Sequence, residues 1–561
     1  MMHLKRITLP AGFAALAISQ AAARPAAPVP VARNGEKPRN VIFILSDDHR
    51  YDFMGFTGAV PWLQTPALDR MAREGACLKN AFVTTSLSSP SRASILTGLF
   101  THTHTVVDNQ APKPDDLVFF PQYLQQNGYR TAFFGKWHMG NQDDMPQPGF
   151  DHWEGFRGQG TYYDTVLNIN GERVKFDPEL YSTDILTDHA IDFVRDNEEG
   201  PFFIYLSYKS VHSGFQPSPS RKGMYKDEKA VYPPSFNVPE YGIPRLPSKD
   251  ADGRPLAGRG WYGESRLPDW VKNQRESWHG VDYQYHGALP YEEDFRNYCE
   301  TVTSMDDAIG RLLDFLQAEG LDESTLVIYM GDNGFTWGEH GLIDKRNFYE
   351  PSVRVPMLAY CPELIPAGRT VEEMVQNIDV APTIMAACGL AKAPQMCGES
   401  FLPLLKGGTA ADWRKRIYYE YYWEYAFPQT PTVFGVRTDR YKYIRYHGIW
   451  DTNEFFDLQE DPYETVNLID RPELQDTIRS LANDLYDWLE TTGGMQIPTN
   501  SSTPCEGFPH EPPPTLTAPN RTPLRATARC RASNRSTACG NSVSPKTSPE
   551  APRISGAPEP T

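Results

Sequence analysis

Two apolar runs of the sequence are each followed closely by oxygen-bearing side chains. Asp47 and Asp48 come after the first run, and Asp332 and Asn333 come after the second. Carboxylate and amide oxygens are the ligands of hard divalent cations such as calcium or magnesium, and this set suits zinc less well. Taken separately, each pair also fits a helix cap or a turn. The metal hypothesis therefore depends on the two pairs meeting in the fold.

A polar segment between these pairs begins at Ser88 and reads Ser-Ser-Pro-Ser-Arg-Ala-Ser-Ile-Leu-Thr-Gly. Pro90 favours the first turn of a helix, and the amino end of a helix attracts anions. The segment differs from the Gly-x-Ser-x-Gly elbow of a Ser-His-Asp hydrolase. From these residues alone, an ordinary helix start is sufficient to explain it.

The elements that must position these groups are predicted from the apolar pattern. Short β-branched and aromatic runs indicate buried strands, and apolar residues at helical spacing between them indicate helices. The expected strands cover residues 40–45, 131–134, 202–206 and 325–330, and the expected helices cover residues 67–74, 182–195 and 294–319. This alternation predicts an α/β fold with helices on both sides of a sheet, in which ligands bind at the carboxyl ends of the strands.

We expect a catalytic domain at residues 39–412 that contains a long insertion at residues 215–291. The insertion is rich in Pro, Gly and aromatic residues, and structureless stretches of that length in a compact domain are usually functional. Its aromatic side chains are candidates for stacking on sugar rings or for pinning the insertion in place. These aromatic residues are Trp261, Trp270, Trp278, Tyr283 and Tyr285.

The C-terminal part of the chain divides into two further segments. Short aromatic-rich strands at residues 417–425, 432–437 and 441–446, followed by an amphipathic helix at residues 474–491, predict a smaller domain at residues 413–497. Residues 498–561 are rich in Pro, Ser, Thr and Arg and hold too few apolar residues to fold. This tail is either disordered or an aberrant extension of the chain.

The N-terminal residues have the three parts of an export signal. A basic start precedes an apolar stretch at residues 11–18 and three alanines at residues 21–23. We expect a signal peptide at residues 1–23, a Pro/Ala-rich spacer at residues 24–38, and a periplasmic or secreted protein. No cysteine follows the apolar stretch, so we expect no membrane anchor.

The chain has 561 residues and a formal net charge of −17. That charge repels nucleic acid and anionic membranes, so we expect neither as a partner. An anionic substrate would then have to be attracted by cations gathered in a pocket. The cysteines are sparse for an exported protein, and Cys388 with Cys397 fits either a disulfide or two free thiols.

The segment that begins at Ser88 resembles the signature of the type I sulfatases, Cys/Ser-x-Pro-Ser-Arg followed by Leu-Thr-Gly. The similarity extends over residues 39–494, and it implies an alkaline-phosphatase-like fold with a large mixed sheet flanked by helices and a smaller C-terminal domain with an antiparallel sheet and a helix. Because this family oxidises the first residue of the signature to formylglycine, the resemblance implies that Ser88 is the precursor and that Arg92 stabilises the modified side chain. The serine form of the signature implies an oxygen-independent maturation enzyme as a partner.

The resemblance also implies one bound calcium ion, with magnesium as the less favoured choice. The implied ligands are Asp47, Asp48, the modified Ser88, Asp332 and Asn333. Single carboxylates of this kind are common without a metal, so this ligand set comes from the family and not from the spacing.

Four further cationic or basic residues match positions that the family uses. The block Gly-Lys-Trp-His-Met-Gly resembles the second sulfatase signature, in which Lys136 and His138 contact the sulfate and the formylglycine. His212 matches a substrate-binding histidine, although Ser213 and the glycine after it stand where the family commonly has a proline nearby. Lys345 matches a lysine that reaches the ester.

Formylglycine would provide a nucleophile that an ordinary serine lacks. Its hydrate carries two hydroxyls on one carbon, so one can attack sulfur while the other later expels sulfate and regenerates the aldehyde. By resemblance, His138 is the base for that expulsion, and Lys345 with His212 assists the departing alcohol. Lys136, Arg92 and the cation offset the negative charge of the transferring group.

These features together predict a sulfatase that acts on a sulfated polysaccharide or oligosaccharide. One alternative is a phosphatase, phosphodiesterase or phosphonate hydrolase on the same scaffold, although those relatives often use two zinc ions with several histidine ligands. Another is a catalytically silent glycan-binding protein. His102 and His104 form a His-x-His pair, which we interpret as packing residues instead of metal ligands.

Overall fold

The computed structural model describes residues 27–498, apart from residues 141, 198–199, 237–266, 275–276, 278, 282–289 and 410–411. The predicted signal peptide, the tail beyond residue 498 and most of the insertion lie outside the described residues. So do four of its aromatic residues, Trp261, Trp278, Tyr283 and Tyr285. None of the helices in the described part combines the length and the apolar character needed to cross a membrane.

A ten-stranded mixed sheet forms the middle layer, with the strand order β13-β2-β12-β9-β1-β8-β4-β5-β6-β7. The run from β9 through β1, β8 and β4 to β5 is parallel, whereas β12 is antiparallel to β9 and to β2. The strands are β1 (Asn40–Ser46), β2 (Ala76–Leu78), β4 (Arg130–Lys136), β5 (His152–Phe156), β6 (Val166–Ile169), β7 (Glu172–Lys175), β8 (Phe202–Ser207), β9 (Thr325–Gly331), β12 (Met357–Tyr360) and β13 (Arg369–Val371).

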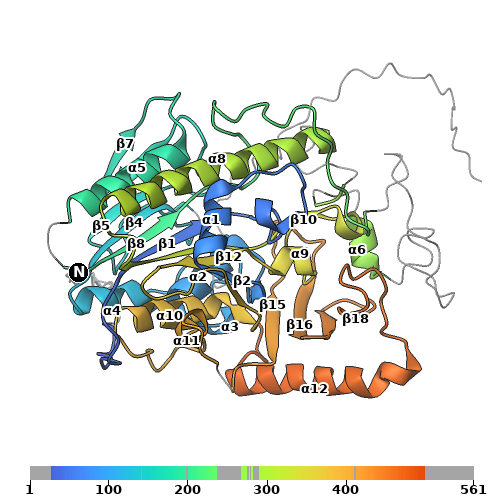
Figure 1. Ribbon diagram of the computed structural model, residues 1–561. Helices are drawn as coiled ribbons and strands as arrows, with labels where there is room; N and C mark the ends of the chain where they lie inside the picture. The colour runs from blue at the N-terminus through green and yellow to red at the C-terminus, as the bar shows by residue number, and fades with distance from the viewer. Residues whose placement is uncertain are drawn as a thin grey trace, which may run out of the picture. The chain divides into compact units, whose positions relative to one another are not determined.

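Alternate residues of the central strands face two different helical layers (Figure 1). In β1, Val41, Phe43 and Leu45 enter one core cluster, and Ile42 with Ile44 enters the other. The second cluster includes residues of α1 (Pro66–Glu74), α5 (Ser182–Arg195) and α8 (Tyr291–Ala318). The first includes residues of α2 (Ser88–Thr97), α4 (Phe120–Gln126), α10 (Val380–Ala387) and α11 (Leu402–Leu405). The period of two therefore buries both faces of the sheet, as the apolar runs predict.

The remaining elements around the large sheet are short helices and two-stranded ladders. The helices are α3 (Thr101–His104), α6 (Asp269–Gln274), α9 (Glu350–Val353), η1 (Gly55–Thr57), η3 (Glu339–Gly341), η4 (Asn377–Asp379) and η5 (Pro472–Leu474). Two small ladders pair β10 (Thr336–Trp337) with β11 (Ile343–Asp344), and β3 (Ala81–Phe82) with β14 (Val375–Gln376).

The antiparallel C-terminal sheet has the order β15-β16-β17-β18. Its strands are β15 (Arg416–Tyr421), β16 (Thr432–Thr438), β17 (Tyr441–His447) and β18 (Glu454–Asp457), and α12 (Gln475–Thr492) packs against it. In Figure 1 this sheet and α12 are the orange elements below the large sheet. Its apolar residues join the same core cluster as one face of the large sheet, so the two sheets share a core. The domain boundary near residue 413 stays a prediction.

The strands and helices expected from the sequence are present, with ends shifted by a few residues. The α/β sheet with helices on both faces and the C-terminal antiparallel sheet with its helix are confirmed. β15 ends at Tyr421, four residues before the predicted end, and Tyr425 is exposed. Trp270 is buried and packs edge-on against Tyr446, so this aromatic residue pins the insertion to the C-terminal sheet. Cys388 and Cys397 are free thiols.

A buried glutamate in the C-terminal sheet makes stability depend on pH. Glu454 begins β18, is fully buried, and accepts hydrogen bonds from the hydroxyls of Tyr349, at 2.9 Å, and Tyr446. Burial raises the pKa of Glu454 from 4.5 to about 8. The folded state therefore binds a proton that the unfolded state has lost, and stability falls as pH rises from about 4.5 to about 8.

We expect Glu454→Gln to remove that part of the pH dependence. Between pH 6 and pH 9 the melting temperature of the wild type should fall more than that of the variant, by about 1 °C for each kcal/mol of difference in a folded unit of this size. Differential scanning calorimetry at both pH values measures this. The exposed Glu473→Gln provides the control. Equal melting-temperature losses in wild type and Glu454→Gln would contradict the assignment.

Candidate active site

The carboxyl ends of β1 and β9 bring together the two pairs of oxygen-bearing residues, Asp47 with Asp48 and Asp332 with Asn333. These strands are parallel neighbours with Ser46 opposite Gly331, so the residues that follow them begin side by side. The amide of Asp332 donates to the carbonyl of Ser46 at 2.9 Å, and the amide of Asp48 donates to Asp332 Oδ1 at 3.0 Å. The two pairs predicted from the sequence therefore meet at one edge of the sheet.

Two oxygen atoms of this cluster are buried and accept no hydrogen bond from the described part of the chain. Asp47, Asp48 and Asn333 are fully buried. Asp48 Oδ2 and Asn333 Oδ1 have no hydrogen-bond partner in the described part of the chain, which is costly for polar atoms removed from water. Ligand atoms of Asp47, Asp48 and His212 all lie within 4.8 Å of one another. Hard oxygens with free lone pairs in such a group fit a divalent cation.

Two lysines lie against the carboxylates that follow β1. Lys136 Nζ donates to Asp47 Oδ2 from the end of β4, and Lys345 Nζ donates to Asp48 Oδ1 from the residue after β11. All four side chains are nearly inaccessible to solvent. Each lysine charge is therefore balanced by one carboxylate in a site of low polarity.

Arg92 of α2 is held by a carboxylate and by the sheet edge. Its Nε and Nη2 donate to Asp332 Oδ2 at 3.0 and 2.8 Å. Its Nη1 donates to the carbonyl of Lys136 at 2.9 Å and to Ser207 Oγ at 2.6 Å. These contacts fix the guanidinium plane between the ends of three strands, so the arginine position is rigid.

Ser88 is the first residue of α2, and Pro90 lies in the first turn as predicted. Its Oγ donates to Asp47 Oδ1 at 3.3 Å, and its side chain is fully buried. The amino end of α2 is therefore directed at the acidic cluster. Unpaired amides at a helix start stabilise an anion, which suits a tetrahedral oxyanion group held at this position.

His138 is held next to Ser88 by the neighbouring serine. Ser89 Oγ donates to the carbonyl of His138 at 2.5 Å and lies 3.3 Å from its Nδ1. Asp48 and His138 both have left-handed backbone conformations, with φ values of 59° and 61°. Strained non-glycine residues of this kind persist where the surrounding structure fixes them, and they cluster at functional sites.

Burial and neighbouring charges shift the pKa values of the histidines, the lysine and the aspartate in this site. Burial lowers the pKa values of His138 and His212 well below 6.5, so both imidazoles are neutral in this structure. Burial also lowers the pKa of Lys136 to about 8, against the opposing charge of Asp47. Burial alone would raise the pKa of Asp47, but the charges around it, first that of Lys136, hold that pKa well below 3.8. A neutral imidazole beside a buried ion pair can accept a proton.

All ten predicted site residues lie in this one cluster. His212 follows β8, and its Nε2 lies 3.7 Å from Asp48 Oδ2. The cluster also contains residues that were not predicted from the sequence, namely Gln159, Tyr162, Ser207 and Lys209. Lys209 could have been found, because it follows β8 as Asp47 follows β1, whereas Gln159 and Tyr162 lie in a loop with no such signal.

The His-x-His pair is a packing feature. His102 Nδ1 lies 2.9 Å from Glu420 Oε2, and its ring packs against Trp488. His104 Nε2 lies 3.0 Å from Ser94 Oγ of α2. Both imidazoles join α3 to neighbouring elements, and neither belongs to the acidic cluster described above.

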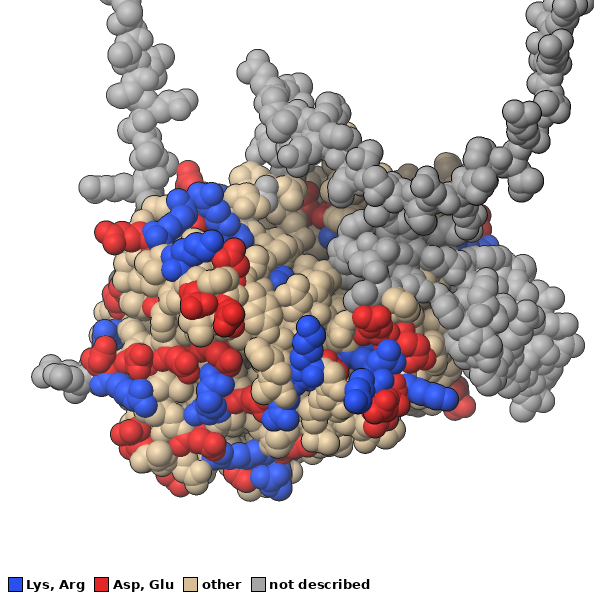
Figure 2. All heavy atoms as spheres, turned by 90° about the horizontal axis from the view of Figure 1, so that it is seen from above, with Lys and Arg blue, Asp and Glu red and all other residues tan. Residues whose placement is uncertain are grey.

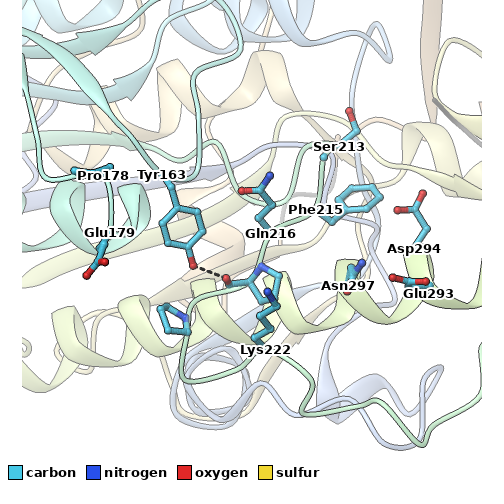
Figure 3. Close-up of a pocket in the computed structure, with 13 residues that line it drawn as sticks. Tyr163, Pro178, Glu179, Ser213, Phe215, Gln216, Lys222, Glu293, Asp294 and Asn297 are labelled. Atoms are coloured by element: carbon cyan, nitrogen blue, oxygen red, sulfur yellow. Dashed lines mark hydrogen bonds between the residues drawn. The ribbon is translucent and has the colours of Figure 1, made fainter. Parts of the chain in front are cut away.

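A cavity of about 1120 Å³ begins at the residues that follow His212. Ser213, Phe215 and Gln216 line it from one side, and Glu293 and Asp294 of α8 line it from another (Figure 3). Burial raises the pKa of Asp294 to about 7. The cavity is lined by none of the ten predicted site residues. It is therefore adjacent space and not the reaction centre.

On the face seen in Figure 2, acidic and basic side chains are interspersed over the described part of the chain. The charged side chains of the cluster are themselves buried. That face therefore presents no broad basic patch in the part of the chain that the structure describes.

A sequence profile of the family described as Sulfatase matches residues 39–390. The chain belongs to the sulfatase family. A second profile, described as N-sulphoglucosamine sulphohydrolase, C-terminal, matches residues 338–491. The prediction of a sulfuric ester hydrolase with the alkaline-phosphatase-like fold is therefore confirmed.

Several curated sulfatases resemble this chain over most of its length. An N-acetylglucosamine-6-O-sulfatase of Bacteroides thetaiotaomicron is 33% identical over 476 residues, which cover 78% of this chain and 84% of that protein. The human N-acetylglucosamine-6-sulfatase is 29% identical over 412 residues, covering 69% of this chain and 68% of that protein. The multifunctional alkaline phosphatase superfamily protein PehA of Trinickia caryophylli is 27% identical and covers 80% of this chain and 95% of that protein.

Solved structures agree with this sulfatase fold. A protein in complex with its substrate, D-glucosamine-2-N,6-O-disulfate, has a TM-score of 0.69 and 31% identity, covering 82% of this chain and 99% of that chain. The phosphonate monoester hydrolase of Agrobacterium radiobacter has a TM-score of 0.63 and 20% identity, covering 81% and 96%. The second similarity concerns the fold alone.

Proposed function

We propose that this sulfatase removes sulfate from a sulfated glycan, through a formylglycine made from Ser88 and with one calcium ion. The observation that carries this proposal is the contact of Ser88 Oγ with Asp47 at the amino end of α2, next to buried oxygens that lack donors. A residue oxidised at this position would lie against the acidic cluster, where an anion is stabilised by the helix start and by Arg92. The proposed maturation enzyme is of the oxygen-independent, serine-type class.

The proposed metal ligands are Asp47, Asp48, Asp332, Asn333 and the modified Ser88. The two unpartnered oxygens, Asp48 Oδ2 and Asn333 Oδ1, support this set because they offer lone pairs that no protein donor uses. A bound divalent cation would polarise the sulfate and make a coordinated hydroxyl more acidic. Calcium is preferred over magnesium because it accepts several carboxylate and amide oxygens in a flexible arrangement.

The side chains around Ser88 have different roles in the proposed reaction. One hydroxyl of the hydrated formylglycine releases its proton to water and bonds to sulfur while the bond from sulfur to the alcohol oxygen breaks. The leaving alcohol takes a proton on the side of Lys345 and His212. The second hydroxyl then loses its proton to His138, the carbon–oxygen bond to sulfate breaks, and the aldehyde re-forms. A neutral His138, held by Ser89, is prepared for that proton.

The first substrate to test is a glucosamine that carries an O-sulfate. Two curated relatives are named as N-acetylglucosamine-6-sulfatases, and the structural neighbour with 31% identity holds a sulfated glucosamine. We further propose that the chain is exported after cleavage near residue 23, which N-terminal sequencing of the mature protein would test.

A direct competition between esters tests the proposed function. The matured protein should hydrolyse 4-nitrophenyl sulfate and N-acetylglucosamine-6-sulfate, with kcat/KM for the aryl sulfate at least about 100-fold above that for 4-nitrophenyl phosphate. Ion chromatography of released sulfate and phosphate measures both reactions. A preference for the phosphate ester would instead support the phosphatase or phosphodiesterase alternative. The similarity to PehA, an alkaline phosphatase superfamily protein, is the reason to test that alternative. Binding of sulfated glycan without release of either anion would support the silent binding protein.

A further inference from the structure

One lysine beside the cluster forms no ion pair with any residue that the structure describes. Lys209 lies in the segment after β8 and is 6% exposed, and its ammonium makes no hydrogen bond or ion pair with the described part of the chain. Its ammonium lies 4.9 Å from the centre of the Tyr162 ring. A cation–π contact offsets part of the cost of burying a charge but does not neutralise it.

The backbone around Lys209 is fixed to the strand that carries the acidic pair. The amide of Asp47 donates to the carbonyl of Ser210 at 2.9 Å, and the amide of Val211 donates to the carbonyl of Asp47 at 2.7 Å. A turn joins Lys209 to His212, whose amide donates to the Lys209 carbonyl at 2.9 Å. Lys209 therefore has a rigid position at the sheet edge that holds the reaction centre.

Tyr162 connects the same lysine to His212. The Tyr162 hydroxyl donates to the His212 carbonyl at 2.7 Å, and the Tyr162 ring stacks on Tyr181 with centroids 5.9 Å apart. His212 Nε2 lies 3.7 Å from Asp48 Oδ2. Three contacts therefore connect Lys209 to Asp48, by way of Tyr162 and His212, and the charges of Asp47 and Asp48 act on the Lys209 ammonium.

Comparing the cations of the site with its carboxylates indicates what Lys209 can bind. Lys136, Lys345 and Arg92 each make their shortest ion pair with a different carboxylate, that of Asp47, Asp48 and Asp332 respectively, so these three cations are matched by three anions. Among the described side chains of this site, Lys209 is the cation left without an ion-pair partner, and a bound divalent ion would add to the positive surplus. A sulfate monoester brings one negative charge. An anionic substrate therefore supplies the missing partner.

We propose that Lys209 is a substrate-binding residue whose ammonium contacts an oxygen of the sulfate group that is cleaved. This inference rests on the proposed function, because it assumes that a sulfate ester enters the cluster. It assigns sulfate recognition on the His212 side to a cation outside the predicted set of ten residues.

The test uses Lys209→Met, which keeps the length of the side chain and removes the charge. We expect KM for 4-nitrophenyl sulfate and for N-acetylglucosamine-6-sulfate to rise about 10- to 100-fold, with kcat changed less than about threefold. The inhibition constant of inorganic sulfate should rise in parallel. Lys209→Arg should stay within about fivefold of the wild type, because the charge is retained. Lys226→Met, on the exposed part of the following loop, is the matched control.

The outcomes separate this inference from the proposed function. If the wild type releases no sulfate from either ester, the proposed function fails. If the wild type is active and Lys209→Met keeps its KM and sulfate inhibition constant, Lys209 does not bind the sulfate. A KM increase for the glycan sulfate alone would also overturn the inference, because the contact would then be with another group of the sugar. Melting temperatures show whether each variant is folded. Lys209→Arg tests separately whether the charge at this position is what binds the sulfate.

Discussion

Replacing Ser88 by alanine is expected to lower kcat/KM for sulfate esters by at least about 10⁴-fold. Alanine has no oxygen that can be oxidised, so the variant lacks both the nucleophile and the second hydroxyl that would expel sulfate. The fold should survive, because only one hydroxyl and its 3.3 Å contact with Asp47 are lost from the start of α2. Steady-state release of sulfate measures the effect, and circular dichroism verifies the fold.

Two measurements accompany this variant. Intact-mass analysis of the native protein should show the loss of two hydrogen atoms at Ser88, and Ser88→Ala should not show it. Ser88→Cys, produced in a host that oxidises the cysteine form of the signature, should recover activity because both forms give the same aldehyde. Turnover by Ser88→Ala within tenfold of the wild type would remove Ser88 from the mechanism.

Chelation of the metal is expected to reduce activity to background, and calcium should restore it more completely than magnesium. Without a cation, Asp48 Oδ2 and Asn333 Oδ1 remain buried and accept no hydrogen bond from any residue that the structure describes. Burial, together with the charges of Asp47 and Asp332, raises the pKa of Asp48 to about 7 despite the opposing charge of Lys345. A divalent cation relieves both penalties, so calcium at 100 times its dissociation constant should stabilise the fold by about 2.7 kcal/mol.

Asp48→Asn is the variant that tests the ligand set. We expect its affinity for calcium, measured by calorimetry on chelated protein, to fall at least about 100-fold, because a ligand charge is lost while the shape is kept. Asp314→Asn is the matched control, since that carboxylate lies on the exposed side of α8 and pairs with Arg70. Full activity in the presence of excess chelator, or unchanged calcium affinity in Asp48→Asn, would contradict the calcium site.

The central strands and their neighbouring helices were predictable because both faces of the sheet are buried. A strand covered on both sides needs a continuous apolar run, and residues 40–45, 202–206 and 325–330 have that pattern. Strands such as β6 and β7 at the sheet edge are short and partly or fully exposed, so no apolar run marks them. β12 is antiparallel between two parallel segments, and no local pattern encodes that direction.

The candidate site likewise contains residues that could be predicted from the sequence and residues that could not. Asp47, Ser88 and Lys136 could be predicted because each stands next to a recognisable strand end or signature. Gln159 and Tyr162 belong to a loop whose position depends on packing against distant segments, so their approach to Lys136 and to His212 had no local signal.

The sequence by itself determined which side chains can do the chemistry and where each strand delivers them, because apolar periodicity and signature spacing are local properties of the chain. Only the tertiary structure decided how the charges pair. Lys136, Lys345 and Arg92 are matched to carboxylates that lie 89, 297 and 240 residues away, and Lys209 is left without one. That pairing follows from the parallel register of β1, β8 and β9 and from burial, which makes every unmatched charge costly enough to require a partner.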